Sequence, residues 1–197
     1  MKIENNADLK KMTTFKMGGT ASKLYTPETE NELINLIQDE HPQYFIGGGS
    51  NIIINTREFD SVVNLREFNS TIENKGNGIY IVGASVRLQK LIKTINADGY
   101  GGIEYLYSVP GLVGGAVVMN AGRGKSFNKC ISDYIESVKV FCRGHVYWME
   151  KADCKFSYRM SNFQHDDAVV LAVRFKFNKT SLETSEALRK ERLELCK

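Results

Sequence analysis

The hydrophobic and polar positions of the chain follow two periods, which predict helices and strands in different places. Apolar residues at helical spacing predict helices over residues 28–40 and 86–97, and the charged residues 182–197 are expected to form a third. Thr29 is expected to cap the first helix, with Glu32 at the capping-box position. Short apolar or β-branched runs predict strands at Ala21–Thr26, Tyr44–Ile46, Ile52–Ile54, Ser61–Leu65, Ile79–Val82, Val138–Cys142, His145–Met149 and Ala168–Phe177.

The order of these elements predicts an α+β fold with mixed sheets. Strands alternate with helices early in the chain, whereas a hairpin with Arg143-Gly144 at its turn comes late. A polar segment rich in turn-forming residues, roughly between Leu65 and Gly78, is the expected boundary between two lobes. Residues 125–137 are expected to form an irregular or helical loop.

The stretch Ser108–Gly124, SVPGLVGGAVVMNAGRG, is both glycine-rich and apolar. An ordinary helix or strand loses backbone entropy at each glycine and packs nothing there. We therefore expect a buried, irregular backbone that a flat or anionic ligand approaches closely. The alternative is a tight packing crossover that binds no ligand.

A second glycine cluster, Gly47-Gly48-Gly49-Ser50-Asn51, lies between two apolar runs. Consecutive glycines expose backbone N–H groups without an obstructing Cβ atom, which suits a phosphate. No G-K-[ST] follows, so this is no Walker A loop, and no helix begins there as a dinucleotide-binding fingerprint would require. The alternative is a flexible hairpin.

Composition narrows the function without identifying it. The 197 residues carry a net charge of +3 with interspersed charges, and no long basic run suggests a nucleic-acid partner. The four cysteines include no C-x-x-C pair, and the histidines are isolated, so we expect reduced thiols and no metal site. No stretch has the length and hydrophobicity of a signal core or membrane span, which predicts a cytoplasmic protein.

Four motifs in order resemble one family. TTFKMGGTA, FIGGGSNIII, IEYLYSVPGLVGGAVVMNAG and FSYRMS, spanning about Thr13 to Phe177, are similar to the UDP-N-acetylenolpyruvoylglucosamine reductases of peptidoglycan synthesis. The resemblance implies a PCMH-type FAD-binding fold of two α+β subdomains that clamp the flavin. It places FAD-binding subdomains at residues 1–68 and 69–178, and a C-terminal helix at 179–197 that leads toward a third domain.

The resemblance also implies a cofactor and the residues that hold it. FAD would be bound non-covalently, because the glycine loop lacks the histidine to which oxidase relatives often attach the flavin. Main-chain amides of the loop would hold the pyrophosphate, and the central stretch would line the isoalloxazine and the rest of FAD. The implied cofactor residues are Ile46, Gly47, Gly48, Gly49, Ser50, Asn51, Ile52, Val109, Pro110, Gly111, Gly114, Gly115, Ala116, Val117, Asn120 and Gly122.

Arg159 matches the arginine of the family's S-Y-R motif, and the implied role is catalytic. In the family, NADPH reduces the flavin and a hydride then goes to the enolpyruvyl β-carbon of a UDP-sugar. A guanidinium beside the substrate carboxylate would stabilise the enolate that develops. Tyr158 and Arg123 are the candidate substrate contacts. The alternative for Arg159 is a surface arginine that pairs with an acidic neighbour.

The chain departs from the family in two places. Arg123-Gly124-Lys125-Ser126 stands where many members have tyrosine and glycine, and neither the proton-donating serine nor the assisting glutamate of the third domain is present. Three readings stay open. The chain is a reductase fragment completed by a separate chain or a second copy, a flavoenzyme acting on another sugar nucleotide in surface-polysaccharide synthesis, or a flavin-binding module without turnover.

Overall fold

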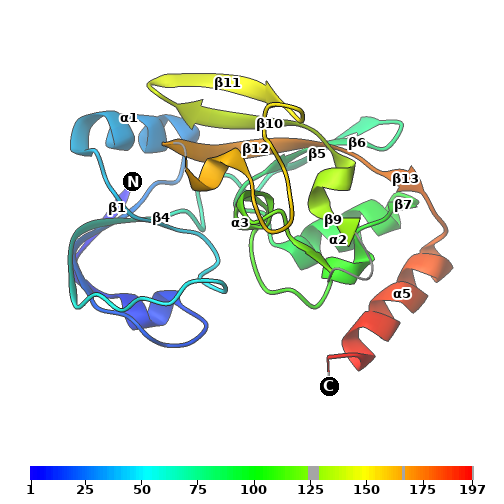
Figure 1. The fold of residues 1–197 in the computed structure, drawn as a ribbon, viewed down its shortest axis with the longest axis horizontal. Coiled ribbons are helices and arrows are strands. Elements are labelled where there is room, and N and C mark those ends of the chain that lie inside the picture. The colour runs from blue at the N-terminus through cyan, green and yellow to red at the C-terminus, as the bar shows by residue number, and fades with distance from the viewer. Residues whose placement is uncertain (124–128, 166, 197) are drawn as a thin grey trace. The chain divides into compact units, whose positions relative to one another are not determined.

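A computed structural model describes residues 1–123, 129–165 and 167–196, and divides the chain into Met1–Asn69 and Ser70–Lys197 (Figure 1). The first part is called unit 1 and the second unit 2. Each unit combines helices with its own sheet, so the predicted α+β class is confirmed. The expected loop at residues 125–128 lies outside the described residues, whereas the residues after it form regular elements given below.

Unit 1 is built on a four-stranded mixed sheet in the order β1-β2-β4-β3. β1 and β2 are antiparallel, while β2 and β3 both run parallel to β4. Thr29 caps α1 as predicted, since its side chain accepts a hydrogen bond from the N–H of Glu32. The elements of unit 1 are β1 (Lys2–Asp8), the 3-10 helix η1 (Leu9–Met12), β2 (Thr20–Thr26), α1 (Glu30–Glu40), β3 (Phe45–Ile46) and β4 (Glu58–Asn64).

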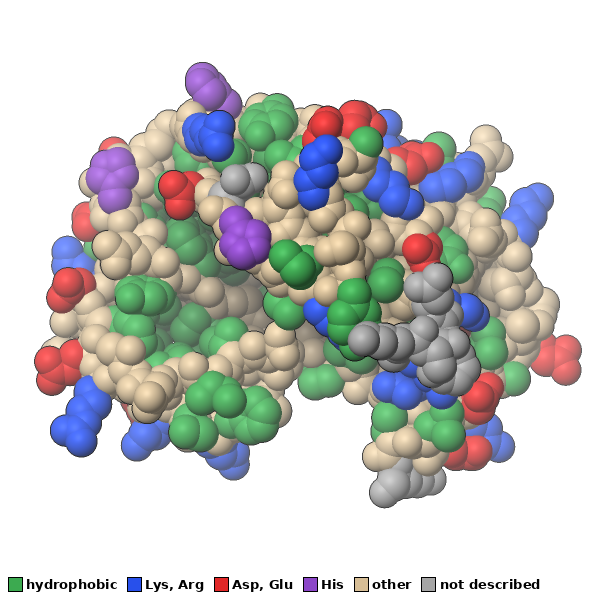
Figure 2. Space-filling view, viewed as in Figure 1, with side chains coloured by type: hydrophobic (Ala, Val, Ile, Leu, Met, Phe, Trp, Pro, Cys, Tyr) green, Lys and Arg blue, Asp and Glu red, His purple; other side chains and the backbone are tan. Residues whose placement is uncertain are grey.

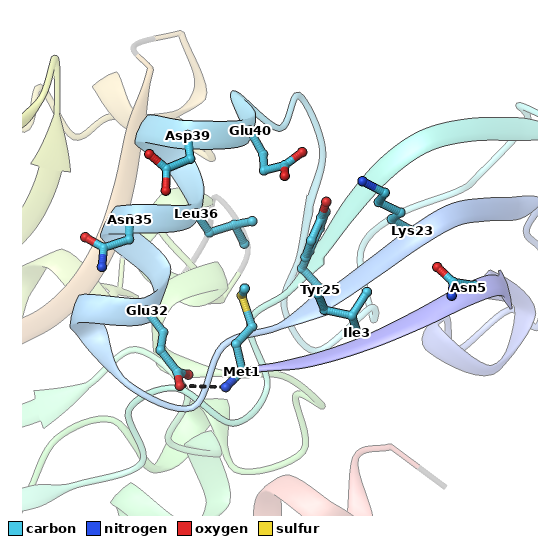
Figure 3. A pocket seen from close by; sticks show the side chains of 10 residues that line it. All are labelled: Met1, Ile3, Asn5, Lys23, Tyr25, Glu32, Asn35, Leu36, Asp39 and Glu40. Atoms are coloured by element: carbon cyan, nitrogen blue, oxygen red, sulfur yellow. Dashed lines mark hydrogen bonds and ion pairs between the residues drawn. The ribbon is translucent and has the colours of Figure 1, made fainter.

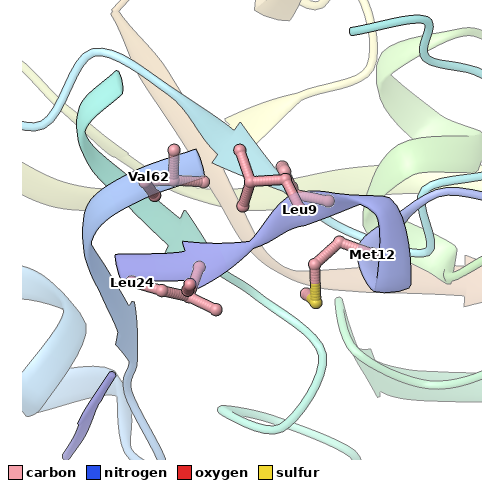
Figure 4. Packing of buried hydrophobic residues seen from close by; sticks show 7 residues of the cluster. Leu9, Met12, Leu24 and Val62 are labelled. Carbon is pink, nitrogen blue, oxygen red and sulfur yellow. The ribbon is translucent and has the colours of Figure 1, made fainter. Parts of the chain in front are cut away.

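The core of unit 1 lies between its sheet and the chain around η1. Leu9, Met12, Leu24 and Val62 pack together there with less than a tenth of each residue exposed (Figure 4). Ile52 and Ile54 pack against this cluster from outside, but the strand predicted at Ile52–Ile54 is wrong. The burial of these isoleucines alternates as in a strand, yet the described chain offers them no pairing partner.

Unit 2 contains a five-stranded antiparallel sheet in the order β11-β10-β12-β6-β5. The predicted hairpin around Arg143-Gly144 is confirmed as β10 and β11. The polar segment that we expected to be only turns contributes the edge strand β5, whose pairing with β6 overrides its hydrophilic composition.

The elements of unit 2 follow in chain order. Short two-residue strands pair as β7 with β13 and as β8 with β9. The bounds are β5 (Ile72–Gly76), β6 (Ile79–Gly83), α2 (Leu88–Ala97), β7 (Tyr100–Gly101), η2 (Glu104–Leu106), α3 (Val113–Val118), β8 (Gly122–Arg123), β9 (Lys129–Cys130), η3 (Ile131–Tyr134), β10 (Ile135–Cys142), β11 (His145–Glu150), η4 (Asn162–Gln164), β12 (Ala168–Lys176), β13 (Asn178–Lys179) and α5 (Leu182–Glu194).

The helix α3 corrects the expectation that the central stretch is irregular throughout. Its six residues, including Gly114 and Gly115, are helical and pack against β6 and β12 of the sheet. A Cβ atom on Gly114 would lie 3.0 Å from the Cβ atom of Ala84. The loss of backbone entropy at this glycine is therefore offset by close approach of the helix to the end of β6.

Candidate functional site

The glycine loop of unit 1, Gly47–Asn51, leaves its β-strand with its carbonyl groups turned toward the protein. The oxygen of Gly49 accepts a hydrogen bond of 2.9 Å from the N–H of Thr14. The oxygens of Gly47 and Gly48 accept hydrogen bonds of 3.1 and 3.2 Å from the guanidinium of Arg66. The loop is therefore held on its carbonyl side.

The opposite side of the loop carries unused donors. No described residue accepts a hydrogen bond from the backbone N–H of Gly48 or Gly49, although Gly49 is buried. Buried N–H groups are nearly always paired, so an unpaired set in a turn is typical of an anion site. The residues present fit one phosphate or pyrophosphate group.

Gly49 must be a glycine for two separate reasons. Its φ of +69° is a left-handed conformation, and a Cβ atom would lie 1.8 Å from the carbonyl oxygen of Met12. The segment that supplies Met12 and Thr14 also contains the TTFKMGG motif, in which the Thr13 hydroxyl closes a turn onto Met17. The motif therefore packs on the loop, a role that the sequence analysis did not assign to it.

In unit 2, the start of the central stretch is fixed by its neighbours. The side-chain amide of Gln89 on α2 donates to the carbonyl oxygens of Tyr107 and Val109, at 3.2 and 2.8 Å. The N–H groups of Val113 and Gly114 donate to main-chain oxygens at positions 86 and 84, both at 2.9 Å. These first donors of α3 are already used, in contrast to those of the glycine loop.

Gly115 is the open position of this stretch. It is exposed, and a Cβ atom placed on it would meet nothing within 4 Å. By contrast, Val117 is wholly buried, so its side chain belongs to the core of unit 2. A flat ring placed over the backbone of Gly115 would meet no side chain there, which fits the predicted isoalloxazine contact.

The end of the stretch is tied to residues 157–164 by four side chains. Asn120 is 3% exposed, and its amide donates to the oxygen of Ser157 at 2.8 Å while accepting from the N–H of Ser132 at 3.3 Å. Ser161 donates to the oxygen of Val118 at 2.6 Å, and Gln164 donates to the sulfur of Met119 at 3.1 Å. The fourth tie is made by Arg159.

Arg159 lies where the two segments meet. Its Nη2 donates to the carbonyl oxygen of Gly122 at 2.7 Å, and its guanidinium stands 5.8 Å from the ring centre of Tyr158. The backbone φ of Arg159 is +58°, a strained value that surrounding contacts must hold. The side chain is exposed, and no carboxylate among the described residues forms an ion pair with it. Within the described residues, no acidic neighbour therefore supports the surface-pair alternative.

The thiol of Cys130 lies near Arg159, and the buried phenol of Tyr105 lies near that thiol. Burial raises the pKa of the Cys130 thiol, the charge of Asp133 raises it further, and Arg159 opposes both. Tyr105 is largely buried with no partner for its hydroxyl among the described residues, and this desolvation raises its pKa. Both groups therefore stay protonated and uncharged near neutral pH.

The structure places the predicted residues in two sets, one in each unit. Ile46 to Ile52 lie in unit 1, whereas Val109 to Gly122, Arg123, Tyr158 and Arg159 lie in unit 2. Gly122 approaches β9 so closely that a Cβ atom would lie 2.5 Å from the oxygen of Lys129. The segment 124–126, predicted to depart from the family, lies outside the described residues.

A pocket in unit 1 lies elsewhere. It measures about 590 Å³ and lies between α1 and the first strands, with Glu40 on the side of Tyr25 and Lys23 and Glu32 bound to the amino group of Met1 (Figure 3). None of the predicted site residues lines it. Figure 2 shows basic and acidic side chains interspersed on the viewed face, as the sequence predicts. Among described residues, no group of three or more His, Cys, Asp or Glu could hold a metal ion, and no helix could cross a membrane.

Comparison with known proteins identifies the family of the chain. Residues 21–149 match the family described as "FAD binding domain". The crystal structure of UDP-N-acetylenolpyruvylglucosamine reductase from Thermus caldophilus is similar with a TM-score of 0.78 and 30% identity, over 98% of this chain and 68% of that one. The chain belongs to the UDP-N-acetylenolpyruvoylglucosamine reductase family of FAD-binding domains. The resemblance predicted from the four motifs is thereby confirmed, and FAD is the family's cofactor.

Two further relatives show how far the family membership extends. The reductase of Fusobacterium nucleatum is 33% identical over 90% of this chain and 63% of its own length, so this chain spans less than two thirds of that relative. An alkyldihydroxyacetonephosphate synthase is similar at 14% identity with a TM-score of 0.60, over 82% of this chain and 32% of that one. The second likeness shows a shared fold alone.

Proposed function

We propose that this chain binds FAD non-covalently and takes part in the reduction of an enolpyruvyl UDP-sugar. The observation that carries the proposal is the pair of N–H groups at Gly48 and Gly49, which have no acceptor among the described residues, while the carbonyl groups of Gly47, Gly48 and Gly49 are bound on the opposite side. Two aligned donors without a side chain beside them suit the FAD pyrophosphate. The remaining proposed contacts to the pyrophosphate are made by Ile46, Ser50, Asn51 and Ile52.

Unit 2 supplies the proposed contacts to the flavin ring. The backbone around Gly115 is open, and the segments beside it, Val109–Gly111 and Ala116–Gly122, are fixed by the hydrogen bonds described above. Both ends of the Asn120 amide are used within the protein, so its proposed role is to hold this segment in place. A rigid, open backbone can place a flat ring without rearrangement.

The chemistry that FAD supplies when bound is hydride transfer, for which NADPH is the proposed reductant. Arg159 is the proposed catalytic residue. With Nη2 anchored on the oxygen of Gly122, the remaining guanidinium donors are available to a substrate carboxylate. Placed there, the positive charge stabilises the negative charge that develops on an enolpyruvyl carboxylate during reduction. Tyr158 and Arg123 are the proposed substrate contacts.

The activity is tested on the purified chain in two steps. Addition of FAD is expected to give a yellow complex that melts at a higher temperature than the apoprotein, because a ligand that binds only the folded state stabilises it. A colourless protein with no thermal shift in FAD contradicts the cofactor assignment. NADPH oxidation with and without UDP-N-acetylglucosamine enolpyruvate then separates a reductase from a flavin-binding module.

The cellular part of the proposal is a cytoplasmic protein of peptidoglycan synthesis. All four cysteines are free thiols, which supports a reducing compartment. Whether a separate chain or a second copy contributes to turnover is tested by measuring sedimentation and NADPH oxidation over the same range of protein concentrations. Activity per chain that rises with association supports such a partner.

A further inference from the structure

Arg66 is the side chain that organises the glycine loop. It follows β4 directly, and its backbone N–H donates to the Asn64 side chain at 3.2 Å. Its guanidinium donates to three main-chain oxygens, namely those of Gly47 at 3.1 Å, Gly48 at 3.2 Å and Met12 at 2.7 Å. One half-buried side chain thus links the loop to Met12, which lies 54 residues before Arg66 in the sequence.

These contacts determine where the loop N–H groups point. In a trans peptide, the carbonyl of one residue and the N–H of the next point in opposite directions, and no peptide among the described residues is cis. Since the oxygens of Gly47 and Gly48 face Arg66, the N–H groups of Gly48 and Gly49 face away from it. Arg66 therefore sets the direction of the two unpartnered donors.

The guanidinium also strengthens those donors. A positive group on a carbonyl oxygen polarises the peptide and makes the N–H at its other end a better donor. Only arginine combines a permanent charge with a planar fork that can reach several carbonyl oxygens at once, whereas lysine offers a single point charge. The glycines themselves have no side chains that could hold the loop in this orientation.

We propose that Arg66 is a positioning residue for the diphosphate of the cofactor, acting through the peptide groups of Gly47 and Gly48 rather than by direct contact. This inference rests on the proposed binding of FAD and adds a residue that neither the motifs nor the family match assigns to the site. The ligand group that it orients the loop to receive is a dinucleotide pyrophosphate.

The test compares Arg66→Lys and Arg66→Gln with the wild type and with Arg57→Gln, which changes an exposed arginine of the same unit. The FAD dissociation constant is measured by flavin fluorescence, and apoprotein folding is checked by circular dichroism. The ³¹P resonances of bound FAD are then recorded at saturating protein. They report the hydrogen bonds around the phosphates and are unaffected by a loss of stability alone.

We expect Arg66→Gln to weaken FAD binding about 100-fold, Arg66→Lys to restore part of that loss, and Arg57→Gln to change it less than threefold. In the saturated Arg66 variants, the ³¹P resonances are expected to shift while the visible flavin spectrum stays the same. Variants that bind FAD within threefold of the wild type, or whose ³¹P resonances coincide with it, overturn the role of Arg66. A wild type that binds no FAD overturns the proposed function itself.

Discussion

The two glycine-rich regions of this chain use glycine in different ways. In the unit 1 loop, a positive φ and the nearby oxygen of Met12 require glycine at position 49. The N–H groups of Gly48 and Gly49 have no acceptor among the described residues. In unit 2, glycine allows α3 to approach Ala84, and the first donors of that helix are used within the protein. A glycine-rich sequence therefore indicates that another group approaches the backbone closely. The hydrogen bonds of that backbone indicate whether the group belongs to the protein or to a ligand.

The largest expected effect comes from a substitution in the unit 1 loop. Gly49→Ala places a methyl group against the oxygen of Met12 in a left-handed conformation, and we expect it to cost roughly 4 kcal/mol of folding free energy and to abolish FAD binding. Gly76→Ala is the matched control, since Gly76 also has a positive φ of +83° but nothing within 4 Å.

The control should lose only about 1–2 kcal/mol, the cost of the backbone conformation alone. Urea unfolding of both apoproteins measures the two losses. If Gly49→Ala is no worse than Gly76→Ala, the close contact with Met12 does not hold the loop and the interpretation of this glycine is wrong.

The next effect concerns the side chains that hold the unit 2 stretch. Asn120→Ala leaves the oxygen of Ser157 and the N–H of Ser132 without their partner, and we expect a loss of about 2–3 kcal/mol. Asn162→Ala is the control, because that amide donates one hydrogen bond, to the oxygen of Asp153, and should lose about 1 kcal/mol. Equal losses in urea unfolding would argue against a special role for Asn120.

The adjacent glycines of α3 sharpen the comparison further. Gly114→Ala brings a methyl group to 3.0 Å from Ala84 and should cost about 1 kcal/mol, whereas Gly115→Ala meets nothing and should gain up to about 1 kcal/mol in the apoprotein. If the flavin ring lies over Gly115, the same substitution weakens FAD binding. Thermal unfolding with and without FAD separates the two effects. If Gly115→Ala leaves the FAD affinity unchanged, the flavin ring does not lie over Gly115.

The smallest expected effect is a pH dependence of the free energy of unfolding of unit 2, which contains all four cysteines. Burial, with the charges of Asp153 and Glu150, raises the pKa of Cys154 to about 12. The folded state therefore favours the thiol, and its stability is lost as pH rises from the unfolded pKa of about 8.5 toward 12. We expect a loss of about 1 kcal/mol or more at pH 10, reduced in Cys154→Ala.

Urea unfolding at pH 8 and pH 10 measures this loss for the wild type and the variant. A fluorophore attached in unit 1 should report a smaller change than one in unit 2, because unit 1 has no cysteine. An identical pH response of the wild type and Cys154→Ala would show that other groups, such as the buried tyrosines, account for it.

The sequence predicted most of the elements because their signals are local. The helical stripe of Leu33 and Leu36 behind the Thr29 cap, and the β-branched run Ala168–Phe177, fold as expected. The failures at Ile52–Ile54 and at β5 have a common cause. A strand exists only where another strand pairs with it, and neither the missing partner of the first nor the partner β6 of the second is visible in the local pattern.

The site was predictable through its glycines and its S-Y-R motif, but the residues that hold it were not. Arg66, Gln89 and Ser161 act through hydrogen bonds to main-chain oxygens distant in sequence. Nothing in the local composition distinguishes them from exposed polar residues, since such a contact depends on tertiary structure. The candidate ligand contacts were therefore accessible from sequence, whereas their supports required the fold.

The hydrogen bond from Arg66 to Met12 has a consequence for folding during translation. The glycine loop emerges from the ribosome before the residue that orients it, so the nascent chain contains the loop without its donors aligned. If FAD binds to this loop as proposed, we expect binding by unit 1 to begin only after β4 and Arg66 have left the exit tunnel. A nascent chain on a ribosome stalled before that point should not bind FAD. A chain on a ribosome stalled well beyond it should have the loop N–H groups oriented for binding.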